Sequence, residues 1–243
     1  ILSSDHVIND NDGFLESIKI GIKYALKGRL VTFGVLPTSP ETGYGYIESE
    51  IPLKDNTVQA SNIVRFLEKP NFPKAKEIYC DKKFTWNSGI FLFKASLIKS
   101  EINKFDPYII SNCEKAISNK NLDLDFLRIN KNDFSKCPNI SIDKAVFEKT
   151  NLGTVIPLRC DWKDIGSWKQ IWENSKKDND GNSLDGKVIL RESKHCFVKS
   201  ENRLVVGIGI ENLTIVETTD AILVASRDTS EQIKSIVQLL NND

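Results

Sequence analysis

Two carboxylate-bearing stretches far apart in the chain have the residue types of a magnesium site. Asp5 stands at the expected end of a strand, and Asp164 stands in a tight turn before a helix expected at 167–173. Carboxylates at the carboxyl edge of an open α/β sheet supply the hard oxygen ligands that Mg²⁺ prefers. Each aspartate could instead cap a helix or a turn, and His6 is expected to be structural. The sharper hypothesis is that Asp5 and Asp164 share one metal ion.

A second group of residues has the chemistry of a sugar phosphate site. Glu68 and Lys69 are adjacent at the end of an expected strand, and Pro70 fixes the exit of the chain. A carboxylate accepts hydrogen bonds from hydroxyl groups, whereas an ammonium binds a phosphate as a point charge. Asn87, expected at the entrance to a strand at 89–93, carries an amide that both donates and accepts. The alternatives are a solvated charge pair at the first position and a β-bulge or turn at the second.

The segment at 40–46 places a glycine on each side of Tyr44. Gly43 and Gly45 would let a ligand approach the backbone closely, because glycine has no side chain. A plain loop that leads into a strand explains the same residues. By itself the segment is therefore weak evidence for a binding site, and it supports one only together with the other two groups of residues.

Alternating helices and strands are expected to position these residues. The apolar spacing and the capping residues predict helices at 10–27, 73–79, 95–105, 107–117 and 141–149. Compact apolar runs predict strands at 30–36, 44–51, 61–67 and 89–93. The alternation indicates an α/β domain with a mostly parallel or mixed sheet.

A turn-rich connector is predicted at 176–186, where the sequence reads KKDNDGNSLDG. We therefore expect a larger domain at 1–175 and a β-rich C-terminal region at 187–243. Short strands are expected in that region at 188–190, 196–198, 204–208, 213–216 and 222–225, before a helix at 229–240. The sequence of this region has no clear fixed-period repeat.

The composition limits the partners and the compartment. Lys plus Arg and Asp plus Glu both number 33, so the net charge gives no general attraction to nucleic acid or to a membrane. The 5 cysteines are widely spaced and never form a C-x-x-C pair, which indicates neither a disulfide framework nor a zinc site. Because the chain has neither a long apolar run nor a signal-peptide pattern, a soluble cytoplasmic protein is expected. It begins with Ile1 and contains no methionine, which predicts a fragment of a longer protein.

A family resemblance rests on motifs that occur in a fixed order, namely SSDHVI, FGVLPTSPETGYGYIE, FLEKPN, WNSGIFLF, SIDKAVFEKT and DWKDIGSW. Together they resemble the bacterial mannose-1-phosphate guanylyltransferases, of the kind often fused to a phosphomannose isomerase domain. The resemblance implies a Rossmann-like (GT-A-like) nucleotidyltransferase fold, with a mixed sheet flanked by helices and a small β-rich appendage. It makes the domain at 1–175 catalytic, and it implies that GTP and mannose 1-phosphate react to give GDP-mannose and pyrophosphate.

The same resemblance implies roles in metal and phosphate binding. Asp5 and Asp164 would hold Mg²⁺, and Lys69 would meet the phosphate of the sugar. A sugar phosphate oxygen would attack the α-phosphorus of GTP in line, so neither a covalent intermediate nor a general base is needed.

For substrate binding, the resemblance implies five further residues. Glu68 and Asn87 would hold mannose hydroxyls, and Asp143 would be another pocket residue. Gly43 and Tyr44 would line the sugar and nucleotide side of the cleft.

The sequence departs from the family pattern at a few positions. The motif that often reads SIDYAVMEKT has Lys144 and Phe147 here, and Ile90 stands where methionine is frequent. Phe147 and Ile90 keep volume and apolarity, so they should be tolerated.

A larger departure is that the family's glycine-rich G-G-x-G-x-R loop does not precede Ile1. Because that loop grips the triphosphate, we expect the chain as given to be catalytically inactive without it. A transferase for another sugar or nucleotide, and a non-catalytic regulatory subunit that binds nucleotide sugars, remain alternatives. The appendage could serve a homodimer contact.

Overall fold

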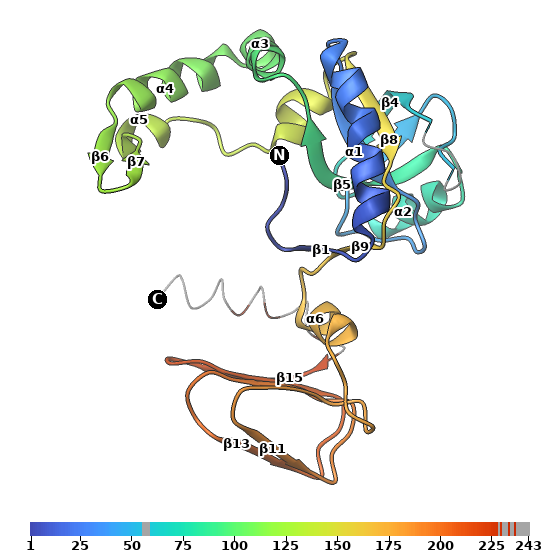
Figure 1. The fold of residues 1–243 in the computed structure, drawn as a ribbon, viewed down its shortest axis with the longest axis vertical. Coiled ribbons are helices and arrows are strands. Elements are labelled where there is room, and N and C mark those ends of the chain that lie inside the picture. Colours follow the sequence, from blue (N-terminus) through green and yellow to red (C-terminus); the bar gives the residue numbers. More distant parts are fainter. Residues whose placement is uncertain (55–58, 228, 230–232, 234–235, 237–243) are drawn as a thin grey trace. The chain divides into compact units, whose positions relative to one another are not determined.

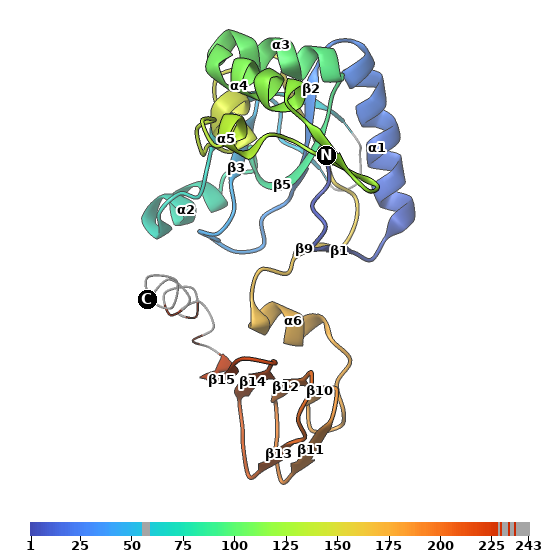
Figure 2. The same cartoon turned by 90° about the vertical axis from the view of Figure 1, so that its left-hand side faces the viewer.

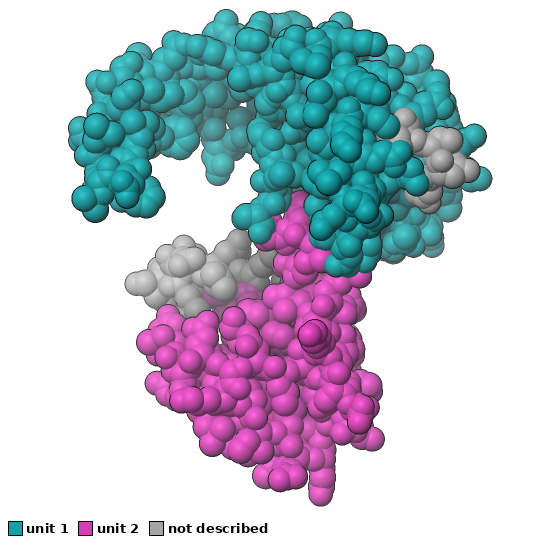
Figure 3. All heavy atoms as spheres, in the orientation of Figure 1, with its two compact units in different colours: residues 1–4, 8–162 teal, residues 5–7, 163–243 magenta. Residues whose placement is uncertain are grey.

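The computed structural model describes residues 1–243 apart from 55–58, 228, 230–232, 234–235 and 237–243. Its contacts divide the chain into two compact units (Figure 3). Unit 1 comprises residues 1–4 and 8–162, and unit 2 comprises residues 5–7 and 163–243. The division passes through β1 (His6–Ile8) and β9 (Trp162–Asp164), which pair with each other as a two-stranded sheet.

Unit 1 is built around a closed sheet with the strand order β2-β5-β3-β4-β8. Figure 1 labels β4, β5 and β8 of this sheet. Its strands are β2 (Leu30–Val35), β3 (Tyr46–Ser49), β4 (Ser61–Leu67), β5 (Phe84–Leu92) and β8 (Gly153–Pro157). The pairing of β2 with β8 is parallel, whereas its pairing with β5 is antiparallel, so the sheet is mixed. Both β2 and β8 are almost continuously buried, which explains their apolar runs.

Helix α1 (Asn11–Leu26) packs on β2 and β8. It begins after Asp10, whose carboxylate caps the helix by accepting from the backbone N–H of Gly13 at 3.0 Å. Beyond its end, Gly28 has φ +80°, a left-handed conformation that glycine adopts without a steric cost. A second helix, α2 (Phe72–Tyr79), packs its buried face beside Phe84 and Trp86 of β5.

Further helical segments lie between β5 and β8 in the sequence. They are α3 (Ala95–Phe105), α4 (Pro107–Ser118), α5 (Lys131–Phe134) and the π-helix η1 (Asp143–Phe147). The π-helix is anchored by Phe147, whose ring lies 4.6 Å from that of Phe91 and 6.3 Å from that of Phe66. Between α4 and α5 the chain forms a hairpin of β6 (Asn121–Asp123) and β7 (Phe126–Arg128), which extends away from the closed sheet (Figure 1).

Unit 2 is a short parallel coil. Its elements are α6 (Trp168–Asn174), β10 (Ser183–Asp185), β11 (Val188–Arg191), β12 (Phe197–Ser200), β13 (Val205–Ile208), β14 (Leu213–Glu217) and β15 (Ile222–Ser226). In Figure 2, β10, β12, β14 and β15 lie side by side, with β11 and β13 at the other end. The pairs β10–β12, β12–β14 and β11–β13 are parallel, and β15 closes the sheet antiparallel to β14.

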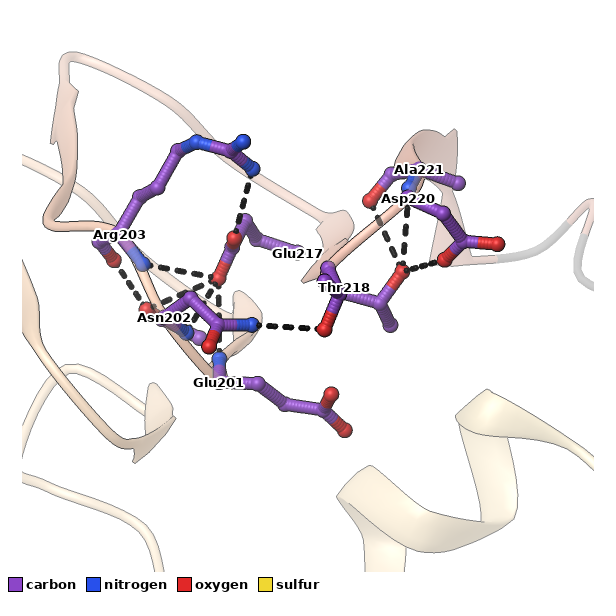
Figure 4. Close-up of polar contacts among 9 residues, drawn as sticks. Glu201, Asn202, Arg203, Glu217, Thr218, Asp220 and Ala221 are labelled. Atoms are coloured by element: carbon purple, nitrogen blue, oxygen red, sulfur yellow. Dashed lines mark hydrogen bonds and ion pairs between the residues drawn. The ribbon is translucent and has the colours of Figure 1, made fainter.

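A buried carboxylate stabilises one turn of the coil (Figure 4). Glu217 is fully buried, and its Oε2 accepts from the backbone N–H groups of Glu201, Asn202 and Arg203 at 3.0, 2.9 and 3.2 Å. The Arg203 side chain adds an ion pair at 3.1 Å. These bonds, with that from Asn202 foremost, hold the pKa of Glu217 below its ordinary value, although its burial opposes them.

The expected α/β class with a β-rich C-terminal region is confirmed. The helix at 95–105 and the strand at 61–67 have the predicted bounds. Strand β8 and the β6–β7 hairpin were not predicted, and β5 begins at Phe84, well before the expected 89. The helix expected at 229–240 falls largely outside the described residues. None of the described helices combines the length and the apolarity needed to cross a bilayer.

Candidate functional site

The carboxylate of Glu68 and the ammonium of Lys69 lie at the end of β4. Lys69 Nζ is 3.7 Å from Glu68 Oε1, and the side chains are 63% and 16% exposed respectively. Lys69 has φ +46°, a left-handed conformation that costs a non-glycine residue roughly 1–2 kcal/mol. Such strain persists only where the surrounding structure holds it. The turn thus sets a largely buried carboxylate beside an exposed ammonium.

Asn87 lies within β5, not at the entrance to a strand as the sequence indicated. The register between β2 and β5 shifts at this point, with Thr32 opposite Phe91 but Gly34 opposite Asn87. The strand therefore bulges immediately after Asn87. Its backbone N–H donates to the carbonyl of Gly45 at 2.7 Å, which joins β5 to the glycine segment before β3.

Asp143 reaches the same place from the π-helix η1. Asn87 Nδ2 donates to Asp143 Oδ1 across 3.1 Å, although the two residues are 56 positions apart. A π-helical turn is frequent at functional sites, since it changes the direction of a side chain within a helical segment. The structure thus brings together Asn87 and Asp143, both of which the sequence analysis expected in the sugar pocket.

Gly45 is the glycine of the 40–46 segment that meets these groups. A Cβ atom built on Gly45 would lie 2.7 Å from Glu68 Oε2 and 3.4 Å from Asn87 Cβ. By contrast, Gly43 is exposed, and a Cβ there would meet nothing within 4 Å. Glu68, Asn87 and Asp143, with Gly45 between the first two, are called the carboxylate cluster below. The sequence contained a signal for Gly45, because two glycines flank Tyr44.

The electrostatics of the cluster follow from burial. Burial raises the pKa of Glu68, the nearby carboxylate of Asp143 raises it further, and Lys69 and Lys144 oppose the shift. Burial also raises the pKa of Asp143, although hydrogen bonds, including the one from Asn87, lower it. Two partly buried carboxyl groups beside a cation form a site that favours hydroxyl donors and an anionic group together.

Tyr44 has an aromatic environment. Its ring packs edge-on against Trp86, with centroids 5.1 Å apart, and against Trp162, with centroids 5.5 Å apart. Edge-to-face packing of this kind fixes the ring orientation. Tyr44 therefore braces the segment that contains Gly45.

Two family models match the chain. Residues 1–181 match the family model described as nucleotidyl transferase. The chain belongs to the nucleotidyl transferase family. Residues 186–240 of this nucleotidyl transferase match a second model, described as MannoseP isomerase/GMP-like beta-helix domain. The parallel coil of unit 2 is consistent with that description.

Individual relatives are similar to this nucleotidyl transferase over nearly its whole length. It is 41% identical to a mannose-1-phosphate guanylyltransferase of Klebsiella pneumoniae, with 100% of this chain and 52% of the relative covered. It is 42% identical to the mannose-1-phosphate guanylyltransferase RfbM of Salmonella typhimurium, with coverages of 100% and 50%. The crystal structure of mannose-1-phosphate geranyltransferase from Thermus thermophilus is similar with a TM-score of 0.78 at 26% identity, covering 99% of this chain and 68% of that one. The chain thus spans about half the length of the curated relatives it matches.

The two aspartates expected to bind metal in this nucleotidyl transferase both belong to unit 2. β1 pairs with β9, and His6 Nε2 lies 4.0 Å from Asp164 Oδ1, so Asp164 is beside the residue that follows Asp5. Asp5 lies immediately before β1, not at the end of a strand as expected, and it is exposed. Asp164 is the last residue of β9, not part of a turn, and it is half-buried. Among the described residues, no group of three or more His, Cys, Asp or Glu side chains could hold a metal ion. Two carboxylates suit Mg²⁺, which usually takes its remaining ligands from water and substrate phosphates.

Proposed function

We propose that the protein transfers GMP from GTP to mannose 1-phosphate and so forms GDP-mannose and pyrophosphate. The observation that carries the proposal is the carboxylate cluster, in which Glu68, Asn87 and Asp143 meet from three separate segments. The names of relatives at 41% and 42% identity support the choice of sugar and nucleotide.

Sugar binding is the first part of the proposed activity. The Glu68 and Asp143 carboxylates accept hydrogen bonds from the sugar hydroxyls, while the Asn87 amide can both donate and accept. The raised pKa values of both acids indicate that their ionised forms lack solvation in the unliganded protein. Hydroxyl donors from a sugar supply part of that missing solvation, which favours a polyhydroxylated ligand over an apolar one.

Phosphate positioning is the second part. Lys69 is placed one residue after Glu68, so its exposed ammonium binds the phosphate of the sugar whose hydroxyls Glu68 holds. An ionised oxygen of that phosphate attacks the α-phosphorus of GTP in line. The bond from the α-phosphorus to the bridging oxygen breaks, and pyrophosphate leaves with the electron pair. The chain contributes orientation and charge neutralisation to this step.

Asp5 and Asp164 would hold the Mg²⁺ that such transferases require. When bound, the ion would neutralise charge on the phosphates. The fit rests on the donor set, since two carboxylates are the number of protein ligands typical for Mg²⁺ beside nucleotide phosphates. His6 lies beside one of these two carboxylates, that of Asp164.

A substrate matrix tests the proposal. The intact protein is supplied with Mg²⁺, with mannose 1-phosphate or glucose 1-phosphate, and with GTP or UTP, and the nucleotide sugars are separated by chromatography. We expect GDP-mannose as the main product, and its formation should require both GTP and mannose 1-phosphate. A preference for another pair would contradict the proposed substrates. Binding of GDP-mannose without turnover would instead support a regulatory subunit.

A further inference from the structure

Thr32 is a fully buried polar residue within the apolar strand β2. Its Oγ1 lies 3.0 Å from the carbonyl oxygen of Ile90 and 3.1 Å from Oδ1 of Asn87. Both partners belong to β5, so the hydroxyl bonds across the two strands. A buried hydroxyl is costly unless such bonds compensate for its lost hydration. Thr32 therefore hydrogen-bonds directly to β5, the strand that supplies Asn87 to the carboxylate cluster.

The two contacts of Thr32 lie at the bulge in β5. Between the pairs Thr32–Phe91 and Gly34–Asn87, β2 advances two residues while β5 advances four. Gly89, inside the bulge, has φ +69°, which other residues adopt only with strain. Bulges of this kind re-aim side chains beside active sites. The Thr32 hydroxyl bonds on both sides of Gly89 and so stabilises the bulged conformation.

The same contacts fix which way the Asn87 amide faces. Its Oδ1 accepts from the Thr32 hydroxyl and from the backbone N–H of Gly89 at 3.3 Å, while its Nδ2 donates to Asp143. A flipped amide would turn its NH₂ group toward the Gly89 N–H and its oxygen toward the Asp143 carboxylate. The flip would therefore place two donors opposite each other at Gly89 and two acceptors opposite each other at Asp143. A single orientation of the amide is therefore favoured.

We propose that Thr32 is a positioning residue for sugar recognition, which holds the β5 bulge and keeps the Asn87 Nδ2 group turned toward Asp143 and the sugar. The identity of the ligand rests on the function proposed above, whereas the positioning of Asn87 does not. Thr32 shares its one hydroxyl hydrogen between Ile90 and Asn87, so a residue of the same shape without the hydroxyl would release both.

Steady-state kinetics on the intact protein give the first test. Thr32→Val removes the hydroxyl at nearly constant volume, and Thr32→Ser keeps the hydroxyl as the matched control. We expect Thr32→Val to raise the KM for mannose 1-phosphate by roughly threefold to tenfold, the effect of one lost neutral hydrogen bond. The KM for GTP should stay within twofold of the parent, and Thr32→Ser should stay near the parent for both substrates. Equal increases in the KM for mannose 1-phosphate and for GTP would overturn the proposal. Equal increases in Thr32→Val and Thr32→Ser would overturn it as well.

A measurement without substrate separates this proposal from the proposed function. Carbon-13 NMR of the side-chain carboxyl groups follows the titration of Asp143, whose pKa the Asn87 hydrogen bond lowers. The charged groups that act on this site, Glu68, Lys69, Lys144 and Glu148, are the same in every variant. In Thr32→Val the pKa of Asp143 should therefore rise, and in Thr32→Ser it should not. An unchanged Asp143 titration in Thr32→Val overturns the proposal. The expected shift in a protein that forms no GDP-mannose would uphold the positioning role and refute the function.

A double-mutant cycle covers the case in which Thr32→Val reduces stability. The cycle combines Asn87→Ala with Thr32→Ala, which also lacks the hydroxyl but cannot crowd its neighbours. If Thr32 acts through Asn87, Thr32→Ala should add nothing to the sugar KM of an Asn87→Ala protein. Full additivity of the two effects would show that Thr32 acts elsewhere and would overturn the proposal.

Discussion

A Cβ atom on Gly45 would lie 2.7 Å from Oε2 of Glu68, whereas one on Gly43 would meet nothing within 4 Å. The distance is below any normal contact, so the Glu68 carboxylate occupies space that only a glycine leaves free. The backbone of Gly45 is fixed as well, because its carbonyl accepts from Asn87 N–H at 2.7 Å. Relief of the clash must therefore come from movement of Glu68.

The substitution Gly45→Ala should displace Glu68 and weaken sugar binding. We expect kcat/KM for mannose 1-phosphate to fall by roughly tenfold to a hundredfold, since displacement of a binding group by about 1 Å has effects of this size. The KM for GTP should change little. Gly43→Ala is the matched control, and steady-state kinetics of both variants provide the comparison. If both variants lose activity equally, the glycine segment acts through its backbone and not through Glu68.

The pH dependence of sugar use should reflect the raised pKa values of the cluster. Glu68 and Asp143 bind hydroxyls best when ionised, so activity is lost as the pH falls through their folded-state pKa values. Because burial raises both values, the acid limb of kcat/KM should lie at a higher pH than ordinary carboxyl groups would give. Glu68→Gln removes one titrating group and should make the limb shallower, whereas Glu77→Gln, an exposed control, should leave it unchanged. An acid limb in the pH range where ordinary carboxyl groups titrate would contradict the assignment of Glu68 and Asp143 to sugar binding.

Lys69→Gln should impair the use of mannose 1-phosphate through KM, kcat or both. Losing one charge-assisted hydrogen bond costs roughly 1.5–3 kcal/mol, or about 10- to 150-fold in kcat/KM. Lys69→Arg should recover only part of the activity, because a planar guanidinium does not fit the site of a compact ammonium. Lys74→Gln, on the surface of α2, is the control. Kinetics of Lys69→Gln within twofold of the parent would make Lys69 an ordinary surface residue.

Asp5→Asn and Asp164→Asn should each raise the Mg²⁺ concentration needed for half-maximal activity. Each variant loses one anionic ligand, so a higher metal concentration should recover part of the activity. Titration of MgCl₂ at fixed GTP measures the effect, and Asp161→Asn, on the exposed residue before β9, serves as the control. A shared metal also requires that the double variant lose little more than the more damaged single variant. Fully additive losses would argue for two independent roles.

Glu217→Gln should destabilise unit 2 and make its stability less dependent on acid pH. The folded-state pKa of Glu217 lies below its unfolded value, so its stabilising effect is complete above the unfolded pKa and is lost as the pH falls through the folded one. At neutral pH the thermal midpoint of the unit should drop by several degrees, because a neutral amide oxygen accepts from the three backbone N–H groups without charge assistance and the amide NH₂ cannot accept from Arg203. Glu211→Gln, at an exposed position shortly before β14, is the control. Equal midpoints for the parent and Glu217→Gln would contradict this role.

The sequence by itself determined those elements whose signals are local. The capped helix α1 and the strand β4 could be predicted because apolar spacing, capping residues and turn residues act over a few neighbouring positions. The placement of Lys69 beside Glu68 could also be predicted, because the two residues are consecutive in the sequence. The order of the motifs was also sufficient to indicate the family, which residues 1–181 confirm.

Tertiary structure alone decided the relationships that depend on distant pairing. The parallel coil of unit 2 escaped prediction because its turns differ in length, with Ser183 opposite Phe197 but Phe197 opposite Thr214. The sequence around Asn87 allowed a β-bulge as one alternative, but only the pairing of β5 with β2 out of register decided that the bulge forms. The contact between Asn87 and Asp143 likewise requires the whole closed sheet, since packing of the core, and not the local sequence, brings η1 to β5.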